Sequence, residues 1–412
     1  MDRKISQLIK AEYQRQSETI NLIPSENYAS LSVRQALGSF LGNKYAEGKP
    51  GKRYYQGSFF IDQIEQLAID RAKKVFGVPY ANVQPHSGSP ANMAVYLALC
   101  QIGQTIMGMD LRSGGHLTHG SPVSFSGQLY KVVSYGVGQD GWLNYREVEK
   151  LARQYRPKII WAGATAYPRF FDWKKFAKIS DSCGAFLIAD ISHYAGLVAG
   201  GSYPSPVPFA DVITLTTHKS LRGPRGAIIL VTKKGLRKDK DLAKKIDRAV
   251  YPGLQGGPHI HTIAGIAVAL GEAQKNSFKK YARQVIKNAK VLADELVNFG
   301  FDLISGGTDN HLVLIDLRKK KINGKEAAVA LERAGIVTNA NAIPNDLASM
   351  VYPSGLRLGT PAVTTRGMKE KEIKMIAGWI NEVIQNFKQK TKLKKINQKV
   401  KKLCHQFPIE NV

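Results

Sequence analysis

The chain has 412 residues, 43% of them hydrophobic, and a formal net charge of +27. This composition is that of a soluble globular protein with about two or three domains, and no apolar run is long enough to span a bilayer. The three cysteines, Cys100, Cys183 and Cys404, are too few and too scattered for a disulfide framework or a metal site. No apolar signal segment follows the first methionine, so we expect a cytoplasmic protein.

A net charge of this size is typical of two kinds of protein. Nucleic-acid-binding proteins gather basic residues on one surface, whereas a lysine-rich proteome spreads them over the whole chain. The lysines here are spread out, and their densest run covers residues 388–395. No RNA-binding motif accompanies the charge. We therefore favour the compositional explanation and keep additional RNA binding through the basic surface as an alternative.

The N-terminal part predicts two helices and an unusual loop. Residues 5–18 have helical spacing, and residues 21–28 form a turn that caps a helix beginning near Ser30. Residues 43–57 contain three tyrosines, a glutamate and several basic residues among glycines and a proline. Glycine and proline at these positions exclude regular structure, so we expect a constrained loop that serves as a binding surface, an oligomer interface or both.

A candidate phosphate site follows a helix predicted at 62–76. The sequence Ser87-Gly88-Ser89 opens a helix that reaches Cys100. A helix start of this kind presents free backbone N–H groups, two hydroxyls and the positive end of the helix dipole, all of which suit a phosphate. Serine and glycine are also common helix caps, so this motif alone leaves both interpretations open.

Short apolar runs then alternate with helical patterns. The predicted strands are 105–109, 130–135, 158–162, 186–189, 211–215 and 227–231, and the predicted helices between them include 145–154 and 173–183. This alternation predicts an α/β fold with an open, mostly parallel sheet. In such sheets ligands bind at the carboxyl ends of the strands.

Two polar residues at neighbouring strand ends indicate a cofactor. Asp190 ends the fourth strand, and Lys219 lies just past the fifth, 219 − 190 = 29 residues later. A buried lysine in such a turn is a usable amine nucleophile, although a solvated basic loop is the alternative. Together with a phosphate cup, this pair matches pyridoxal phosphate, which needs a lysine for its Schiff base and an acid at its pyridine nitrogen.

A helical region from about 261 to 298 leads to a second α/β region. There we expect strands at 311–317 and near Leu356, helices at 325–334 and 369–387, and a further helix from Gln389. We therefore expect an N-terminal arm with the dimer and active-site loop (1–75), a large cofactor-binding domain (76–270) and a small α+β C-terminal domain (271–412).

Many long motifs in one order make nearly the whole chain resemble the serine hydroxymethyltransferase family. They lie at 22–27, 43–48, 53–55, 84–88, 114–122, 216–219, 221–226, 256–258, 305–311 and 354–360. The resemblance implies the fold of aspartate-aminotransferase-type (fold type I) enzymes with pyridoxal phosphate, and a homodimer or a tetramer of dimers with shared active sites. It also implies reversible transfer of the one-carbon unit of serine to tetrahydrofolate, which leaves glycine.

Cofactor residues follow from this resemblance position by position. Lys219 resembles the lysine that holds pyridoxal phosphate, Asp190 the acid at the pyridine nitrogen, and His116 the imidazole stacked on the cofactor ring. The remaining cofactor-binding residues that the resemblance implies are Ser87, Gly88, Ser89, Thr165, His193, His218 and Gly257, the last one from the partner subunit.

The resemblance also implies substrate-binding and catalytic residues. Arg357 resembles the arginine that grips the amino-acid carboxylate, with Ser25 as its helper. Glu47 resembles the acid that handles a proton at the serine hydroxyl and at the carrier. Tyr45, Tyr54 and Tyr55 resemble the tyrosines around it, and Tyr45 and Glu47 reach in from the neighbouring subunit. Thr217 resembles the hydroxyl beside the Schiff base, and Thr217 and Tyr55 join Lys219 and Glu47 as catalytic residues.

The carrier end departs most from the family. Leu111, Gly115, Leu117 and Asn341 resemble the folate-contacting residues. Ala340 stands where the family usually has lysine, Ser113 where a histidine is usual, and Gln56 where a glycine is usual. The carrier is therefore expected to be tetrahydrofolate or a modified pterin. A carrier-independent aldolase, which uses the same cofactor to split threonine or another β-hydroxy amino acid, is the alternative.

Overall fold

The computed structural model describes residues 2–409, which fold into two compact units. One unit runs from Ala29 to Arg283, and the other combines the residues up to Tyr28 with those from Gln284 onward. The three-part division expected from the sequence stays a prediction. Within residues 2–409, no helix is long and apolar enough to cross a membrane.

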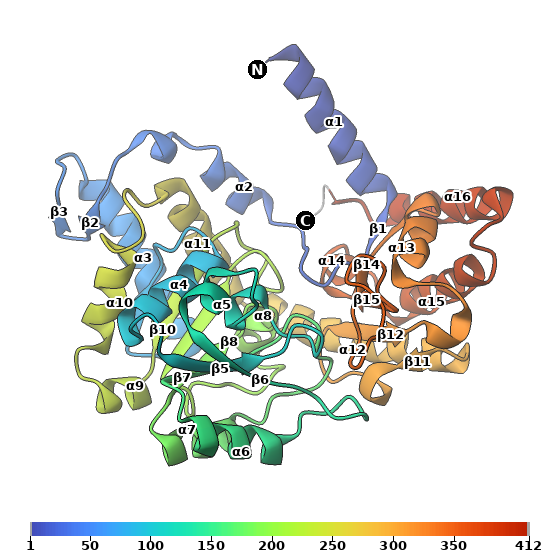
Figure 1. The fold of residues 1–412 in the computed structure, drawn as a ribbon. Coiled ribbons are helices and arrows are strands. Elements are labelled where there is room, and N and C mark those ends of the chain that lie inside the picture. The colour runs from blue at the N-terminus through green and yellow to red at the C-terminus, as the bar shows by residue number, and fades with distance from the viewer. Residues whose placement is uncertain (1, 410–412) are drawn as a thin grey trace. The chain divides into compact units, whose positions relative to one another are not determined.

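The unit of residues 29–283 is built on a seven-stranded sheet (Figure 1). The strand order is β4-β10-β9-β8-β7-β5-β6. The bounds are β4 Tyr80–Asn82, β5 Thr105–Met109, β6 Lys131–Tyr135, β7 Ile159–Ala162, β8 Phe186–Asp190, β9 Val212–Thr216 and β10 Ala227–Val231. Strands β6, β5, β7, β8 and β9 pair in parallel, and β10 runs antiparallel to both its neighbours. The predicted α/β fold with a mostly parallel sheet is therefore confirmed.

Helices cover both faces of this sheet. Strands β7 to β10 are buried at every position, as their continuous apolar sequences require. On one face, Tyr96 of α4 (Gly88–Leu99) packs on Trp161 with ring centroids 5.1 Å apart. Helices α6 (Tyr145–Tyr155) and α7 (Trp173–Cys183) lie on the opposite side of the sheet (Figure 1).

The other helices of this unit surround the sheet. They are α2 Leu31–Leu37, α3 Phe59–Phe76, α5 Phe125–Leu129, α8 Ala195–Ala199, α9 Lys233–Lys238, α10 Leu242–Val250 and α11 Ile260–Ala273, with 3-10 turns η1 Phe40–Asn43 and η2 Leu117–His119. The single helical region expected at 261–298 is two helices, α11 and α12 (Asn276–Asn298).

The loop at residues 43–57 contains regular structure, so the expectation that glycine and proline exclude it is wrong. Strand β2 (Gly48–Lys49) pairs with β3 (Lys52–Arg53) in a short antiparallel hairpin. Gly48 has a φ of +95° and Gly51 a φ of +73°. Side chains other than glycine rarely adopt this conformation, so these glycines permit the hairpin rather than prevent it.

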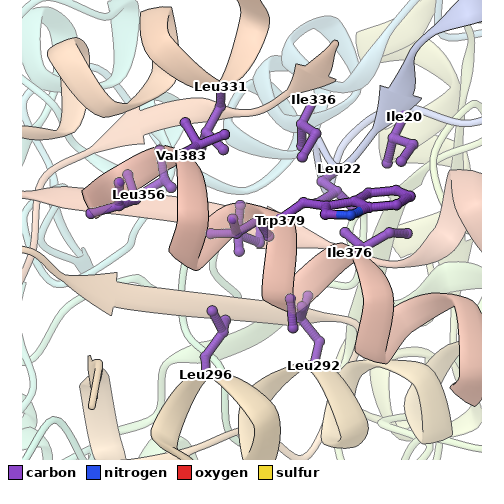
Figure 2. Close-up of a cluster of buried hydrophobic side chains, with 14 of the residues drawn as sticks. Ile20, Leu22, Leu292, Leu296, Leu331, Ile336, Leu356, Ile376, Trp379 and Val383 are labelled. Carbon is purple, nitrogen blue, oxygen red and sulfur yellow. The ribbon is translucent and has the colours of Figure 1, made fainter. Parts of the chain in front are cut away.

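The second unit is built on a four-stranded sheet of order β11-β12-β15-β14. Its elements are α1 Arg3–Glu18, β1 Ile20–Asn21, β11 Asp302–Leu303, η3 Ile304–Gly306, β12 Leu312–Asp316, η4 Arg318–Lys320, α13 Gly324–Arg333, β13 Ile336–Val337, β14 Asn339–Asn341, β15 Gly355–Gly359, α14 Pro361–Thr365, α15 Glu370–Gln385 and α16 Lys390–Gln406. The N-terminal segment belongs here because β1 pairs with β13. Figure 2 shows Ile20 and Leu22 in the core with Ile336 and Trp379.

A buried arginine joins the ends of the first and last helices of this unit. The guanidinium of Arg366 donates hydrogen bonds to the carbonyls of Ser17 (3.0 Å) and Thr19 (2.8 Å), at the end of α1. It also donates to the carbonyls of Cys404 (2.9 Å) and Phe407 (2.7 Å), at the end of α16. Carbonyls at the end of a helix lack the next turn of N–H donors, so this one cation supplies hydrogen bonds to both helix ends.

Candidate active site

Four adjacent parallel strands bring the predicted cofactor residues to one edge of the large sheet. Asp190 is the last residue of β8, and Lys219 follows β9. Thr165 follows β7, and its hydroxyl donates to the carbonyls of Gly114 (3.2 Å) and Gly115 (3.0 Å), which follow β5. The carboxyl ends of these strands therefore meet, as the strand order requires.

Asp190 is buried and held in its ionised form. Its Oδ2 accepts a hydrogen bond from Asn92 Nδ2 (2.9 Å) and lies 3.0 Å from His119 Nε2, while its Oδ1 accepts one from the backbone N–H of Ser192 (3.0 Å). Burial raises the pKa of Asp190, but the hydrogen bonds from His119 and Ser192 outweigh it and hold that pKa well below its usual range. The carboxylate is therefore a fixed negative charge at neutral pH.

Asn92 links this carboxylate to His116. It lies one helical turn after Gly88 on α4, and its amide donates both to Asp190 and to Thr118 Oγ1 (2.8 Å). Thr118 Oγ1 lies 2.7 Å from His116 Nδ1, and the Thr118 backbone N–H donates to the same nitrogen (3.2 Å). His116 Nδ1 is therefore an acceptor, which assigns the proton of the neutral ring to Nε2.

His116 is a neutral imidazole. Burial, reinforced by the nearby His119 and Lys219, lowers the pKa of His116 to about 4. At neutral pH the ring carries no charge, so it offers a flat, uncharged surface beside the Asp190 carboxylate.

The turn that carries Lys219 is closed by internal hydrogen bonds. The Gly223 N–H donates to the Thr217 carbonyl (2.7 Å), and the Thr217 hydroxyl donates to the Pro224 carbonyl (2.6 Å). Arg222 has a φ of +61° and donates its N–H to the Lys219 carbonyl (3.0 Å). Lys219 itself is 9% exposed. A buried lysine on a closed turn is positioned for one partner rather than for solvent.

Ser220 ties the same turn to the end of β8. Its hydroxyl donates to the carbonyl of His193 (2.9 Å) and accepts the N–H of Gly196 (3.0 Å). Next to it, burial and the charges of Lys219 and Arg225 lower the pKa of His218 to about 3. The predicted residues His193, His218 and Lys219 therefore lie on one hydrogen-bonded framework.

The start of α4 forms an anion cup. Ser87 is the N-cap residue of this 12-residue helix, and its side chain makes no capping hydrogen bond. A Cβ on Gly88 would lie 2.7 Å from Thr216 Cγ2, so a larger residue there would have to displace the Thr216 side chain. The first N–H groups of the helix and the hydroxyls of Ser87 and Ser89 are thus available to an anion. With the Asp190 carboxylate, the neutral His116 and the buried Lys219, the residues present fit pyridoxal phosphate.

A second group surrounds Glu47 on the hairpin loop. The ring centroids of Tyr45 and Tyr55 are 5.2 Å apart, and those of Tyr54 and Tyr251 are 5.8 Å apart. Glu47 is hydrogen-bonded to Tyr251. The side chains of the loop tyrosines remain accessible, with Tyr45 56%, Tyr54 70% and Tyr55 44% exposed.

A glycine pair lies against this loop. A Cβ on Gly256 would come within 3.3 Å of Glu47 Oε1, and one on Gly257 within 3.4 Å of the Tyr45 ring. The backbone of Gly257 is also hydrogen-bonded to the ring of His86, the residue before Ser87. Within one chain, the Glu47 loop therefore lies next to the segment that leads into the anion cup.

The predicted carrier residues of the large unit lie at the end of β5. Leu111 and Gly115 belong to a tight turn in which the Gly114 N–H donates to the Leu111 carbonyl (3.1 Å) and the Gly115 N–H to the Asp110 carbonyl (2.9 Å). Leu117 is 45% exposed and flanks His116. These apolar and backbone groups adjoin the cofactor residues of the same strand end.

The other predicted residues lie in the unit with the four-stranded sheet. Arg357 on β15 is paired with Asn339 on β14, and its Nε donates to Asn339 Oδ1 (3.2 Å). Asn341 also lies on β14, and its amide donates to the Ala342 carbonyl (2.6 Å). The segment with Ser25 is attached to the same sheet, because the Gly359 N–H donates to the Leu22 carbonyl (2.7 Å).

Sequence reasoning missed the residues that hold this site together. The sequence motifs contain Asn92, Thr118 and His119, but each motif was interpreted through other residues. The position of Asn92, four residues after Gly88, indicates that it faces the same side of the helix as the anion cup. Its distance of 98 residues from Asp190 hides the contact itself.

Comparison with known proteins agrees with this geometry. A sequence model described as "Serine hydroxymethyltransferase" matches residues 1–380. A serine hydroxymethyltransferase from Desulfotalea psychrophila is 54% identical over 407 residues, which cover 99% of this chain and 94% of that protein. The match includes both units and leaves little of either protein unaligned. The chain therefore belongs to the serine hydroxymethyltransferase family.

Proposed function

We propose that this chain transfers the hydroxymethyl carbon of serine to tetrahydrofolate or a related pterin and leaves glycine. The family works in general with pyridoxal phosphate and tetrahydrofolate. The observation that carries the proposal is the buried, ionised Asp190 at the strand end beside that of Lys219. When bound, pyridoxal phosphate supplies an electron sink for the bond that breaks at the amino-acid α-carbon.

Asp190 and His116 tune this electron sink from two sides. The Asp190 carboxylate would favour a protonated pyridine nitrogen, because a fixed negative charge stabilises a neighbouring N–H⁺. Neutral His116 would lie against the ring without adding a positive charge, which would oppose that protonation. Asn92 holds Asp190 directly and His116 through Thr118, so the carboxylate and the imidazole keep one relative orientation.

The other cofactor residues position the group. Lys219 is the amine that would hold the aldehyde carbon of the bound cofactor, and the uncharged His218 beside it would add no repulsion. Ser87, Gly88 and Ser89 bind the phosphate through the free N–H groups and hydroxyls at the start of α4. Thr165 and His193 contact the ring substituents, and the Thr217 hydroxyl lies on the Lys219 turn.

Arg357, Ser25 and Glu47 act on the substrate. The planar guanidinium of Arg357 binds the serine carboxylate through two parallel hydrogen bonds, and Ser25 supports it. Glu47 holds or moves the proton of the serine hydroxyl, with Tyr54 and Tyr55 around it. Leu111, Gly115, Leu117 and Asn341 contact the carrier, which remains tetrahydrofolate or a modified pterin.

A spectral titration with matched lysine variants tests the proposal. Lys219→Gln is expected to lose the visible absorbance of covalently bound cofactor and nearly all glycine formation. Lys233→Gln, at an exposed lysine, is the control and keeps both. Full turnover by Lys219→Gln would overturn the assignment.

The role of the carrier is tested on the wild-type chain. Adding tetrahydrofolate to the glycine-loaded protein is expected to change the cofactor spectrum and to accelerate serine cleavage. The departures at Ala340, Ser113 and Gln56 favour the aldolase as second candidate. A rate of serine cleavage that does not respond to any reduced pterin would favour that aldolase.

We further propose a homodimer in which Tyr45, Glu47 and Gly257 serve the partner's site. Mixing Lys219→Gln chains with Glu47→Gln chains distinguishes shared from separate sites. In a shared arrangement each mixed dimer regains one intact site, so the mixture recovers about a quarter of wild-type activity. If Glu47 serves its own chain, the mixture stays as inactive as either variant.

A further inference from the structure

Two buried side chains donate hydrogen bonds to the main chain on both sides of Glu47. Arg53 Nη1 donates to the carbonyls of Ala46 (2.9 Å) and Gly48 (3.0 Å), the residues before and after Glu47. Gln84 Nε2 donates to the same Gly48 carbonyl (2.8 Å). The Arg53 side chain is 3% exposed and Gln84 is 6% exposed, so water does not compete for these bonds.

Two carboxylates of α3 hold the arginine in this orientation. Arg53 Nε lies 2.8 Å from Asp62 Oδ1, and Nη2 lies 2.6 Å from Glu65 Oε2. Gln84 Nε2 also donates to Glu65 Oε1 (2.7 Å), so Arg53, Glu65, Gln84 and the Gly48 carbonyl form a closed cycle of hydrogen bonds. A buried guanidinium needs such partners, since an unpaired charge in the interior is strongly destabilising. Arg53, Gln84 and Glu65 therefore form one closed unit.

The carbonyl of Glu47 itself is also fixed. It accepts a hydrogen bond from the backbone N–H of Tyr54 (3.2 Å) across the hairpin. Three consecutive carbonyls, those of Ala46, Glu47 and Gly48, are thus bonded. The main chain that carries the Glu47 carboxylate is therefore held by hydrogen bonds at Glu47 and on both sides of it.

Gln84 also ties this loop to the anion cup. Its main-chain carbonyl accepts a hydrogen bond from Gln255 Nε2 (3.0 Å), and Gln255 Oε1 accepts the N–H of His86 (3.0 Å). His86 precedes Ser87, and Gln255 precedes the glycine pair that lies against Glu47. The side chain of Gln84 therefore holds the Glu47 loop, while its main chain belongs to the segment that ends in the phosphate cup.

A purely structural role for this network is the alternative, but the hairpin has a separate anchor. Asp247 contacts Lys49 on β2 and is hydrogen-bonded to Tyr80 and to Asn82, the latter at 2.9 Å. That anchor attaches a side chain of the hairpin to the sheet. Arg53 and Gln84 instead bind the main chain next to Glu47, which is the part whose position matters for proton transfer.

We propose that Gln84, acting with Arg53, is a positioning residue for Glu47 and fixes the main chain from which this carboxylate extends. The inference rests on the proposed role of Glu47 in the reaction. It predicts a specific pattern: loss of Gln84 slows the step that needs Glu47 and leaves cofactor binding in place.

The test compares Gln84→Leu with wild-type holoenzyme. Leucine removes the amide at similar volume, and kcat for tetrahydrofolate-dependent serine cleavage is expected to fall roughly 10- to 100-fold. The visible absorbance of the bound cofactor and the KM for serine stay within a factor of about three. Tyr80→Phe is the control, because it removes one hydrogen bond to Asp247 without touching the carbonyls beside Glu47, and it keeps its kcat.

A double-mutant cycle separates positioning from general damage. In a Glu47→Gln background, Gln84→Leu is expected to lower kcat by less than about threefold, because the group that it positions is already gone. If the two effects multiply instead, or if Gln84→Leu alone keeps its kcat, the inference is overturned while the proposed function stands. Full turnover by Glu47→Gln would overturn the role of Glu47 and the inference together.

A second variant covers the case in which Gln84→Leu does not fold. Gln84→Asn retains an amide donor that is one methylene shorter, so its hydrogen bonds to Gly48 and Glu65 are expected to be weaker. It is expected to give a smaller loss of kcat of the same kind, again without loss of cofactor absorbance. An unchanged kcat in a folded Gln84→Asn protein would overturn the inference.

Discussion

The cofactor end and the Glu47 loop of residues 29–283 are ordered in opposite ways. At the cofactor end the hydrogen bonds fix side-chain atoms: Asp190, Asn92 and His116 are bonded to one another directly or through Thr118. In the Glu47 loop the bonds fix main-chain carbonyls, and the tyrosine side chains stay exposed. At the cofactor end the hydrogen bonds hold the side-chain atoms themselves. In the Glu47 loop they hold the main chain that carries the side chains.

This difference suits two kinds of partner. A cofactor that stays bound profits from side chains that are preorganised before it arrives, since no reorganisation is then needed during the reaction. A carrier that enters and leaves needs accessible side chains on a backbone that does not move. The comparison predicts that substitutions at the cofactor end affect the chemistry and the fold together, whereas those at the exposed loop side chains affect the fold little.

The largest effect is expected from Asp190→Asn. The amide is similar in shape but carries no charge, so it does not stabilise a protonated pyridine nitrogen. We expect kcat for glycine formation to fall on the order of 10³-fold, as for the loss of a preorganised charge in a buried site. Steady-state kinetics with saturating cofactor measure it. A variant that keeps its kcat would show that the fixed charge is not part of the chemistry.

Acid is expected to destabilise the cofactor end. The pKa of His116 is about 4 in the folded protein against 6.5 as its ordinary value, so the unfolded chain binds a proton first as the pH falls. Stability from this group is complete above about pH 6.5 and is lost towards pH 4, by about 3 kcal/mol. Thermal unfolding midpoints between pH 4 and 8 measure the loss. His116→Asn should flatten this part of the profile, and an equally steep profile in that variant would contradict the assignment.

Asn92→Leu tests whether the link between Asp190 and His116 matters. We expect a loss of stability of about 1–3 kcal/mol and a roughly 10- to 100-fold lower kcat, because two hydrogen bonds that orient reactive groups disappear. Asn288→Leu is the matched control: it is also a buried asparagine that donates twice, to Thr364 and Met368, but in the other unit. Comparable stability losses with a kcat loss only in Asn92→Leu support the link. Equal kcat values in both variants would show that the hydrogen bonds of Asn92 do not affect the reaction.

The smallest effect is expected at the exposed loop. Tyr54 is 70% exposed, so Tyr54→Ala should change the free energy of unfolding by no more than about 0.5 kcal/mol. Urea denaturation measures the change. A loss above about 2 kcal/mol would show that tyrosine packing, rather than the main-chain bonds of Arg53 and Gln84, holds the loop.

The sequence predicts the sheet and the main site residues because their signals are local. Strand β5, helix α7 and strand β10 lie at the predicted residues, and Asp190 and Lys219 lie at neighbouring strand ends as expected. The three-residue strand β4 is too short to show a periodicity. Glycines at 48 and 51 were interpreted as breakers, although their positive φ angles form the hairpin.

The hydrogen-bond networks around Asp190 and Glu47 cannot be predicted from neighbouring residues in the sequence. Asn92 meets Asp190 across 98 residues, and Gln84 meets Gly48 across 36 residues. Such pairs depend on how the elements pack, and neither composition nor spacing encodes them. The strand-end positions of Asp190 and Lys219 were therefore predictable, whereas the side chains bonded to Asp190 were not.

The pairing of β1 with β13 has a consequence for the order of synthesis. Ile20 can pair with Ile336 only after the ribosome has added 336 − 20 = 316 further residues. At a rate of about 5–20 residues per second, this delay lasts roughly 15 to 60 seconds. Residues 29–283, which form the other unit, emerge as one uninterrupted piece in the meantime. Until Leu292 is made, the apolar Ile20 and Leu22 lack every other member of their core cluster, so the nascent N-terminus exposes apolar side chains that a ribosome-bound chaperone can bind.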